Sequence, residues 1–177
     1  MNKKLWFKTL NSPRVLFIVV LLVLASFASA PAFTLLTPGY RGDKIQAGYQ
    51  IPIKSGEHTG AYRTNDVSVN YRYLKSGDDL NMSGTVRFVG GIPMNFNYVD
   101  YFHLGMLLGN SEGAILSNHG LTSASWVNLT GPSDQVHFSR NLVLPPKTTV
   151  MAFTYTGQAS EGGAGGNTQF WQYPIVG

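Results

Sequence analysis

The chain contains no cysteine among its 177 residues. Disulfides, thiol catalysis, Cys-based zinc sites and a lipid-modified N-terminal cysteine are therefore excluded. Export is still compatible with this composition, because a domain of about 140 residues can bury enough apolar surface to be stable without covalent cross-links.

Charged residues are also scarce, at 12% of the chain, which is about half of their usual share. The formal net charge of +4 belongs to the N-terminus, where Lys3, Lys4, Lys8 and Arg14 precede an apolar run. Setting these four aside leaves nine basic residues against nine acidic ones. No basic stripe remains in the rest of the sequence, so the charge pattern argues against a nucleic-acid partner.

The apolar run from Val15 to Phe27 reads VLFIVVLLVLASF and is followed by the small residues Ala28, Ser29 and Ala30. A cationic stretch, an apolar stretch and small residues in this order are typical of a secretory signal peptide. Proline at position 31 disfavours cleavage after Ala30, whereas cleavage after Ala28 remains open.

The same segment also fits an uncleaved membrane anchor. No charged residue occurs between Arg14 and Arg41, and a stretch of roughly 20 apolar residues can span a bilayer. The positive flank would stay in the cytoplasm and place the following domain outside. We predict a signal peptide or anchor helix over residues 1–36 and an exported domain over 37–177. This domain is expected in the periplasm or on the extracellular face of the cytoplasmic membrane, or secreted if the leader is cleaved.

No sustained helical period occurs after residue 40, and alternation of apolar and polar residues takes its place. The alternation is clearest in Asp66–Leu74 and Leu80–Phe88, which are separated by the polar segment Lys75–Asp79. This pattern predicts a β-hairpin with one wet face. The predicted inward side chains are those of Val67, Val69, Tyr71, Tyr73, Leu80, Met82, Val86 and Phe88, with Gly84 on the same face.

Tyr101–Leu108 is largely apolar on both faces, which predicts a central strand. Further strands are expected at Ile45–Ile53, Met94–Val99, Ala114–Ser117, Ala124–Leu129, Gln135–Leu144, Thr148–Thr156 and Gln169–Ile175. Short strands separated by Gly, Pro, Asn and Ser predict an all-β domain built as an antiparallel two-sheet sandwich, of jelly-roll or Ig-like type. A closed β-barrel is the alternative.

One segment, Gly109–Gly113, matches the G-x-S-x-G pattern of a hydrolase nucleophile, with Ser111 at its centre. That elbow requires a helix directly after it, and only the short stretch Ala114–Ser117 follows. Asp134 and His137 come later in the order of a catalytic triad, but they are three residues apart on a predicted strand and diverge. We interpret Ser111 as a hairpin-turn residue and predict a non-enzymatic protein, with a serine hydrolase as the weaker alternative.

Neither a metal nor a cofactor is predicted. The four histidines, His58, His103, His119 and His137, show no metal-ligand spacing. Asp78, Asp79 and Asn81 lack the spacing of an EF-hand loop. The glycine-rich segment 162–166 precedes a predicted strand, whereas a phosphate-binding loop precedes a helix.

Aromatic residues give the one signal for a binding site. Trp126 lies on a short predicted strand, and Phe170, Trp171 and Tyr173 crowd the last one, where the adjacent Phe170 and Trp171 cannot share a face. Trp126, Trp171 and Tyr173 are the candidate binding residues, since exposed rings beside Asn, Gln and Ser can stack on sugars or dock a protein. The competing interpretation places the rings of one face in the core and those of the other under partial cover, since aromatic residues are common in sandwich cores.

The leading functional hypothesis is a non-enzymatic, envelope-facing module that binds or supports a protein partner, including as an accessory subunit of a membrane complex. The alternative is a carbohydrate-binding domain that uses its exposed aromatic residues. The membrane itself is a partner if the N-terminal segment is not cleaved.

Overall fold

The computed structural model describes residues 42–131 and 134–177. The chain divides into two units, Met1–Phe33 and Thr34–Gly177, and the described residues all belong to the second unit. The predicted signal peptide or anchor helix, residues 1–36, lies outside the described residues. None of the helices in the described part is long and apolar enough to cross a bilayer.

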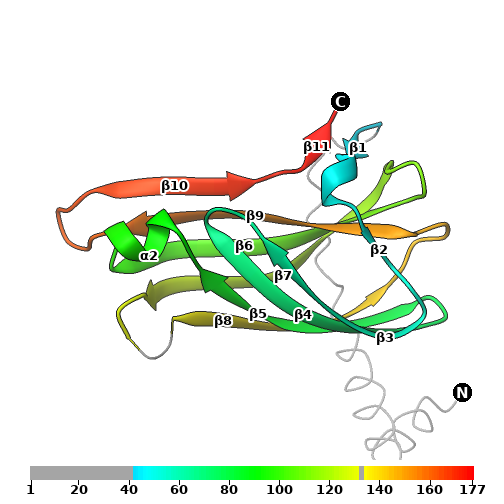
Figure 1. Cartoon of the computed structure of the whole chain (residues 1–177), viewed down its shortest axis with the longest axis horizontal. Coiled ribbons are helices and arrows are strands. Elements are labelled where there is room, and N and C mark those ends of the chain that lie inside the picture. Colours follow the sequence, from blue (N-terminus) through cyan, green and yellow to red (C-terminus); the bar gives the residue numbers. More distant parts are fainter. Residues whose placement is uncertain (1–41, 132–133) are drawn as a thin grey trace, which may run out of the picture. The chain divides into compact units, whose positions relative to one another are not determined.

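The described residues form three antiparallel sheets (Figure 1). The four-stranded sheet has the order β3 (Gly56–Arg63), β4 (Val67–Ser76), β5 (Asp79–Phe88) and β8 (Gln135–Val143). The five-stranded sheet has the order β10 (Asn167–Gln172), β9 (Val150–Ser160), β6 (Tyr98–Gly109) and β7 (Ile115–Asn128), with β2 (Ile51–Pro52) also paired to β9. A small ribbon pairs β1 (Lys44–Ile45) with β11 (Ile175–Val176). The all-β prediction is confirmed, and the closed-barrel alternative is wrong because the sheets do not close on themselves.

The predicted hairpin is formed by β4 and β5. Val67 pairs with Phe88, Val69 with Val86 and Tyr73 with Met82, so that the apolar set lies on one face as expected. The turn is tighter than the predicted five-residue loop, because Ser76 already pairs with Asp79. Gly77 takes the first central position with φ of 60°, which glycine adopts without steric cost.

Several predicted boundaries are wrong for local reasons. Residues expected to begin a strand at Met94 belong instead to the short helix α2 (Gly91–Asn95), since Gly90 turns the chain with φ of 62° and Pro93 is tolerated in a first helical turn. The expected strand Ile45–Ile53 is broken into β1, the 3-10 helix η1 (Ala47–Tyr49) and β2. The expected strands Ala114–Ser117 and Ala124–Leu129 fall, except for Ala114 and Leu129, within the single long strand β7. Strand β3 was not predicted.

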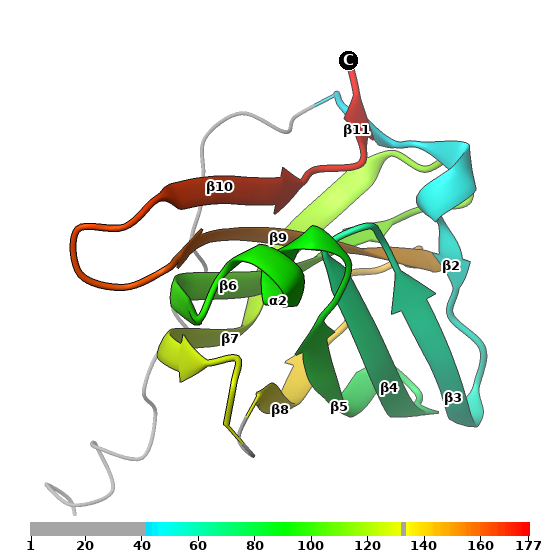
Figure 2. The same ribbon diagram turned by 60° about the vertical axis from the view of Figure 1, so that its left-hand side comes forward.

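Side chains from both larger sheets build one core, and Figure 2 shows these sheets as separate layers. Phe88 from the four-stranded sheet meets Phe102 from the five-stranded sheet edge to face, with ring centroids 5.1 Å apart. Tyr62 and Tyr71 both pack on Phe153, at 5.4 Å and 5.2 Å. Aromatic pairs of this kind are worth about 0.5–1.5 kcal/mol beyond the area that they bury.

A second, smaller core lies on the other side of the five-stranded sheet. Ile45, Leu107, Val150 and Ala152 are buried there, with Ile115 and Ile175 packed against them. The β1–β11 ribbon supplies Ile45 and Ile175 and so covers one end of the sheet's outer side. Among residues 42–131 and 134–177, no further strand or helix covers the remaining part of that outer side.

Candidate functional site

The open part of the outer side of the five-stranded sheet gathers aromatic rings and uncharged polar groups. One row across four strands consists of Trp171, Thr156, His103 and Ser123. The neighbouring row consists of Gln169, Gln158, Tyr101 and Ser125. We call the surface formed by these two rows and the adjoining Tyr173, Thr154, Gly105 and Gly120 the Trp171 face.

The three aromatic residues predicted as binding residues are all exposed but are not all together. Trp171 is 62% exposed and Tyr173 46% exposed, two residues apart at the end of β10. Trp126 is 72% exposed but lies on β7, at the opposite edge of the sheet. Three strand spacings, about 14 Å, separate β7 from β10. Phe170 turns into the core beside Phe102, as its adjacency to Trp171 requires.

A hollow of about 260 Å³ opens on the Trp171 face. Three members of the row that contains Trp171 line it, namely His103, Ser123 and Thr156, whereas Trp171 lies outside the lining. Gly105 of β6 pairs with Gly120 of β7 just after a register shift, so that two residues without side chains face each other across the strands. A Cβ atom at Gly120 would meet nothing within 4 Å, whereas one at Gly105 would lie 2.6 Å from Thr154 Oγ1. The facing glycines therefore form part of the lining and leave the hollow open. Irregular pairing of this kind is common next to binding sites.

Polar groups line the hollow and are held in place by their neighbours. His103 Nδ1 lies 2.8 Å from Ser123 Oγ, and the imidazole packs 5.8 Å from the ring of Tyr101. Asn118, Thr122, Thr154, Thr156 and Tyr173 supply the rest of the polar lining. None of these side chains is a formal acid or a fixed cation, so the lining can donate and accept hydrogen bonds without carrying a net charge.

Trp126 is held in an unusual backbone conformation. Its φ is 55°, in the left-handed region that bulky side chains rarely adopt. Such a conformation costs about 1–3 kcal/mol and is concentrated at functional positions. The ring stands at the β7 edge as a second exposed aromatic group, away from the hollow.

Ser111 and His137 of the triad pattern lie in different parts of the fold. Ser111 lies in the turn between β6 and β7, where Asn110 Oδ1 accepts hydrogen bonds from the backbone N–H groups of Glu112 (3.0 Å) and Ala114 (2.9 Å). Strand β7, not a helix, follows this turn. His137 belongs to β8 of the four-stranded sheet, and its Nδ1 pairs with Thr85 Oγ1 at 3.1 Å.

The two remaining histidines have local partners. His58 Nε2 lies 3.0 Å from Ser55 O, and His119 Nε2 lies 2.9 Å from Ser117 Oγ, where burial lowers the pKa of the imidazole. Within residues 42–131 and 134–177, no group of three His, Asp or Glu side chains gathers as a metal site would require. Asp78 and Asp79 lie at the β4–β5 turn, and the glycine-rich segment 162–166 forms the β9–β10 hairpin loop, directly before a strand.

Two tyrosine hydroxyls lie between the sheets. Burial raises the pKa of Tyr155 to about 12, although the hydrogen bond with Thr64 Oγ1, at 2.8 Å, opposes this shift. Burial also raises the pKa of Tyr62 above its usual range, and in the described part of the chain its hydroxyl has no hydrogen-bond partner. Both groups remain neutral at physiological pH and act as core side chains.

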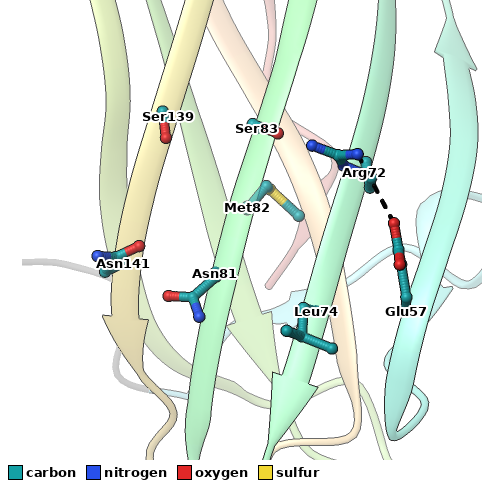
Figure 3. A pocket seen from close by; sticks show the side chains of 8 residues that line it. All are labelled: Glu57, Arg72, Leu74, Asn81, Met82, Ser83, Ser139 and Asn141. Atoms are coloured by element: carbon teal, nitrogen blue, oxygen red, sulfur yellow. Dashed lines mark ion pairs between the residues drawn. The ribbon is translucent and has the colours of Figure 1, made fainter.

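The outer side of the four-stranded sheet carries a second hollow, of about 340 Å³ (Figure 3). Arg72, Ser83 and Ser139 form one row across β4, β5 and β8, and Leu74, Asn81 and Asn141 form the next. Glu57 of β3 pairs with Leu74 at the edge of the second row. We call the surface formed by these seven residues the Arg72 face.

Both hollows contain residues that sequence reasoning did not single out. Gly105, Gly120 and Thr154 belong to no motif, and Arg72 and Asn81 are simply two of the polar residues that alternate along the predicted hairpin. Polar residues that alternate along a strand indicate a solvent-exposed face, but they do not indicate that this face contains a hollow. Which residues of different strands lie side by side depends on register, which the sequence does not give.

No protein-family model, no curated protein and no solved structure matches the chain.

Proposed function

We propose that the chain is an exported, non-catalytic binding module with a β-sandwich fold, and that its ligand is a neutral glycan bound on the Trp171 face. The observation that carries this proposal is the combination of exposed Trp171 and Tyr173 with an uncharged, hydrogen-bonding hollow on one open sheet surface.

The chemistry of a sugar ring matches this surface in two respects. The C–H groups of a pyranose ring form an apolar face that packs on an aromatic ring, and Trp171 offers such a platform. The hydroxyl groups at the edge of the sugar need both donors and acceptors, which Thr156, His103 and Asn118 supply. A few polar groups placed around an apolar contact are typical of small-ligand sites.

The absence of fixed charge in the lining favours a neutral ligand. The two rows of the Trp171 face consist of aromatic, hydroxyl, amide and imidazole side chains. The nearby Asp100 carboxylate is already engaged by Gln158 Nε2, at 3.2 Å, and by Ser160 Oγ. An anionic or cationic ligand would therefore find no opposite charge in the hollow.

The N-terminal leader supports export. The positions of the triad residues support a non-catalytic role. Residues 15–27 with their cationic flank have the order of a signal peptide or anchor. Ser111 lies in the β6–β7 turn, without the helix that a nucleophile elbow needs, and His137 lies on β8 of the four-stranded sheet.

Binding of the full-length chain to a glycan array, followed by calorimetric titration of the best neutral glycan, tests this function. Trp171→Ala is expected to weaken binding at least about tenfold. Gly120→Val fills the hollow without a backbone clash and is expected to have a similar effect. The matched control is Gly48→Val, since a Cβ atom at Gly48 also meets nothing within 4 Å and Gly48 lies on η1. An array without any signal, or equal loss in both glycine variants, would argue against this site.

A protein partner at the β7 edge is the second candidate function, favoured by Trp126. Its strained φ of 55° and its exposed ring are the features expected of an interface anchor. If this is correct, one defined envelope protein co-purifies with the full-length chain, and Trp126→Ala abolishes the association while Trp171→Ala preserves it. Association that survives Trp126→Ala would remove this candidate.

A further inference from the structure

The Arg72 face carries a second built hollow that does not depend on the proposed glycan site. Its lining comes from all four strands of the sheet, with Glu57 on β3, Arg72 on β4, Asn81 and Ser83 on β5, and Asn141 on β8. Figure 3 shows the guanidinium of Arg72 and the carboxylate of Glu57 along one side and the two asparagine amides along the other. Leu74 lies between Glu57 and Asn81 in one row, and the short side chain of Ser83 lies next to Arg72 in the other.

The charge of Arg72 is only weakly satisfied within the protein. Arg72 Nη1 lies 3.7 Å from Glu57 Oε1, and the two side chains are 63% and 62% exposed. Exposed ion pairs of this length contribute about 0–1 kcal/mol, so an incoming anion can replace Glu57 at little cost. The guanidinium has five N–H donors arranged in a fork that matches carboxylate and phosphate oxygens.

The groups around Arg72 select between these two anions. Asn81 and Asn141 each offer an amide donor and acceptor, and Ser83 and Ser139 each offer a hydroxyl that can do both. Inorganic phosphate would use the guanidinium and leave most of these groups to water. A ligand that places several hydroxyls next to one carboxylate would engage both the charge and the polar walls. Leu74, which is 46% exposed, adds an apolar contact for the ring carbons.

We propose that the Arg72 face binds a hydroxylated carboxylate of the uronic-acid class, with the carboxylate on Arg72 and the hydroxyls on the asparagine and serine side chains. Glu57 then limits the affinity, because it competes for the guanidinium and repels the incoming carboxylate. The volume of about 340 Å³ is at the lower end for ligand sites, which fits a single sugar ring.

Titration of the full-length chain with D-glucuronate, followed by calorimetry or by the Nε–H signals of arginine in NMR spectra, tests this inference. Arg72→Gln is expected to weaken binding at least about tenfold, because a charge-assisted, bidentate contact is lost. Glu57→Gln is expected to tighten binding by a few fold. The matched control is Arg87→Gln, an exposed arginine of the same sheet that does not line the hollow. Ser139→Gln fills the hollow without changing the charge and is expected to weaken binding.

Four results would contradict the proposal. The first is the absence of saturable D-glucuronate binding, and the second is binding of equal strength in Arg72→Gln. In a parallel titration, inorganic phosphate that binds as tightly as D-glucuronate, with the same dependence on Arg72, would show that the polar walls do not select a sugar acid. Weaker binding after Glu57→Gln would also contradict the assigned role of Glu57. Because these arms use an acidic sugar and leave Trp171 intact, failure here is distinguishable from failure of the neutral-glycan site.

Discussion

The Trp171 face and the Arg72 face are both outer sides of antiparallel sheets over one shared core, yet their chemistry differs. The Arg72 face follows the ordinary rule that the outward residues of an antiparallel strand are polar. The Trp171 face departs from that rule, because it exposes two large rings beside uncharged polar groups. Because packing does not require exposed rings, the exposed rings of the Trp171 face are the stronger indication of a binding function. The Arg72 face instead offers one charged group, the guanidinium of Arg72, to a ligand.

The two faces also differ in how they are covered. The β1–β11 ribbon closes one end of the outer side of the five-stranded sheet by burying Ile45 against Leu107 and Val150. This cover ends beside the hollow, where Tyr173 precedes β11 in the chain. On the Arg72 face the walls are side chains of the sheet itself. The hollow of the Trp171 face is therefore shaped partly by the segment that leads into β11, whereas the hollow of the Arg72 face is shaped only by the register of four strands.

Disruption of the shared core should affect both faces at once and has the largest expected effect. Phe102 is fully buried and contacts Phe88, Tyr155 and Phe170. Phe102→Ala is expected to lower the free energy of unfolding by about 3–5 kcal/mol, through lost burial and a residual cavity. Urea denaturation measures this change, and Trp171→Ala serves as the exposed control with an expected change within about 0.5 kcal/mol. Equal values for the two variants would contradict a common core.

Alkaline pH should also weaken both faces together, by less than the loss of Phe102. The pKa of Tyr155 is raised from 10.0 to about 12 by burial, so the unfolded chain releases this proton at lower pH than the folded protein does. The stabilisation is therefore complete below pH 10 and declines as the pH rises towards 12. The urea midpoint at pH 9, 10 and 11 checks this, and Tyr155→Phe should flatten the decline. A midpoint that stays constant up to pH 11 would be inconsistent with buried tyrosine hydroxyls.

The two facing glycines of the Trp171 face should respond differently to the same substitution. Gly105→Ala places a Cβ atom 2.6 Å from Thr154 Oγ1, and Thr154 is a buried, β-branched residue with little freedom to move. A loss of about 1–2 kcal/mol in unfolding free energy is expected. Gly120→Ala is the matched control, with an expected change within about 0.5 kcal/mol, because its Cβ atom meets nothing within 4 Å. A larger loss for Gly120→Ala than for Gly105→Ala would show that the hollow is built differently.

Sequence patterns predicted those parts of the fold in which alternation is strong. The β4–β5 hairpin was predicted because Val67, Val69, Val86 and Phe88 alternate with polar residues. Strand β3 was missed because its inward positions before Tyr62 hold Gly56, His58 and Gly60, which give no apolar alternation. The long strand β7 was predicted as two pieces because Ser, Thr, Asn and Gly fill its centre.

The candidate sites were predictable to a smaller extent. The opposite orientations of Phe170 and Trp171 follow from their adjacency in one strand, and the exposure of Trp171 agrees with this expectation. The pairing of Gly105 with Gly120 depends on a register shift, and the grouping of Arg72 with Asn141 depends on strands that are distant in sequence. Local patterns carry no information about such pairings.

The smallest expected effect concerns the ion pair that distinguishes the Arg72 face. Arg72 and Glu57 are both exposed, so solvent screens their attraction, and a double-mutant cycle of Arg72→Gln and Glu57→Gln should give a coupling of no more than about 0.5 kcal/mol in unfolding free energy. A coupling near zero is compatible with a strong effect of Arg72→Gln on D-glucuronate binding, because a ligand carboxylate in the hollow would engage more of the guanidinium than Glu57 does at 3.7 Å. A coupling above about 1.5 kcal/mol would mean that the pair stabilises the fold. The guanidinium of Arg72 would then be held by Glu57 in the folded protein, and the Arg72 face would no longer offer a free cation to a ligand.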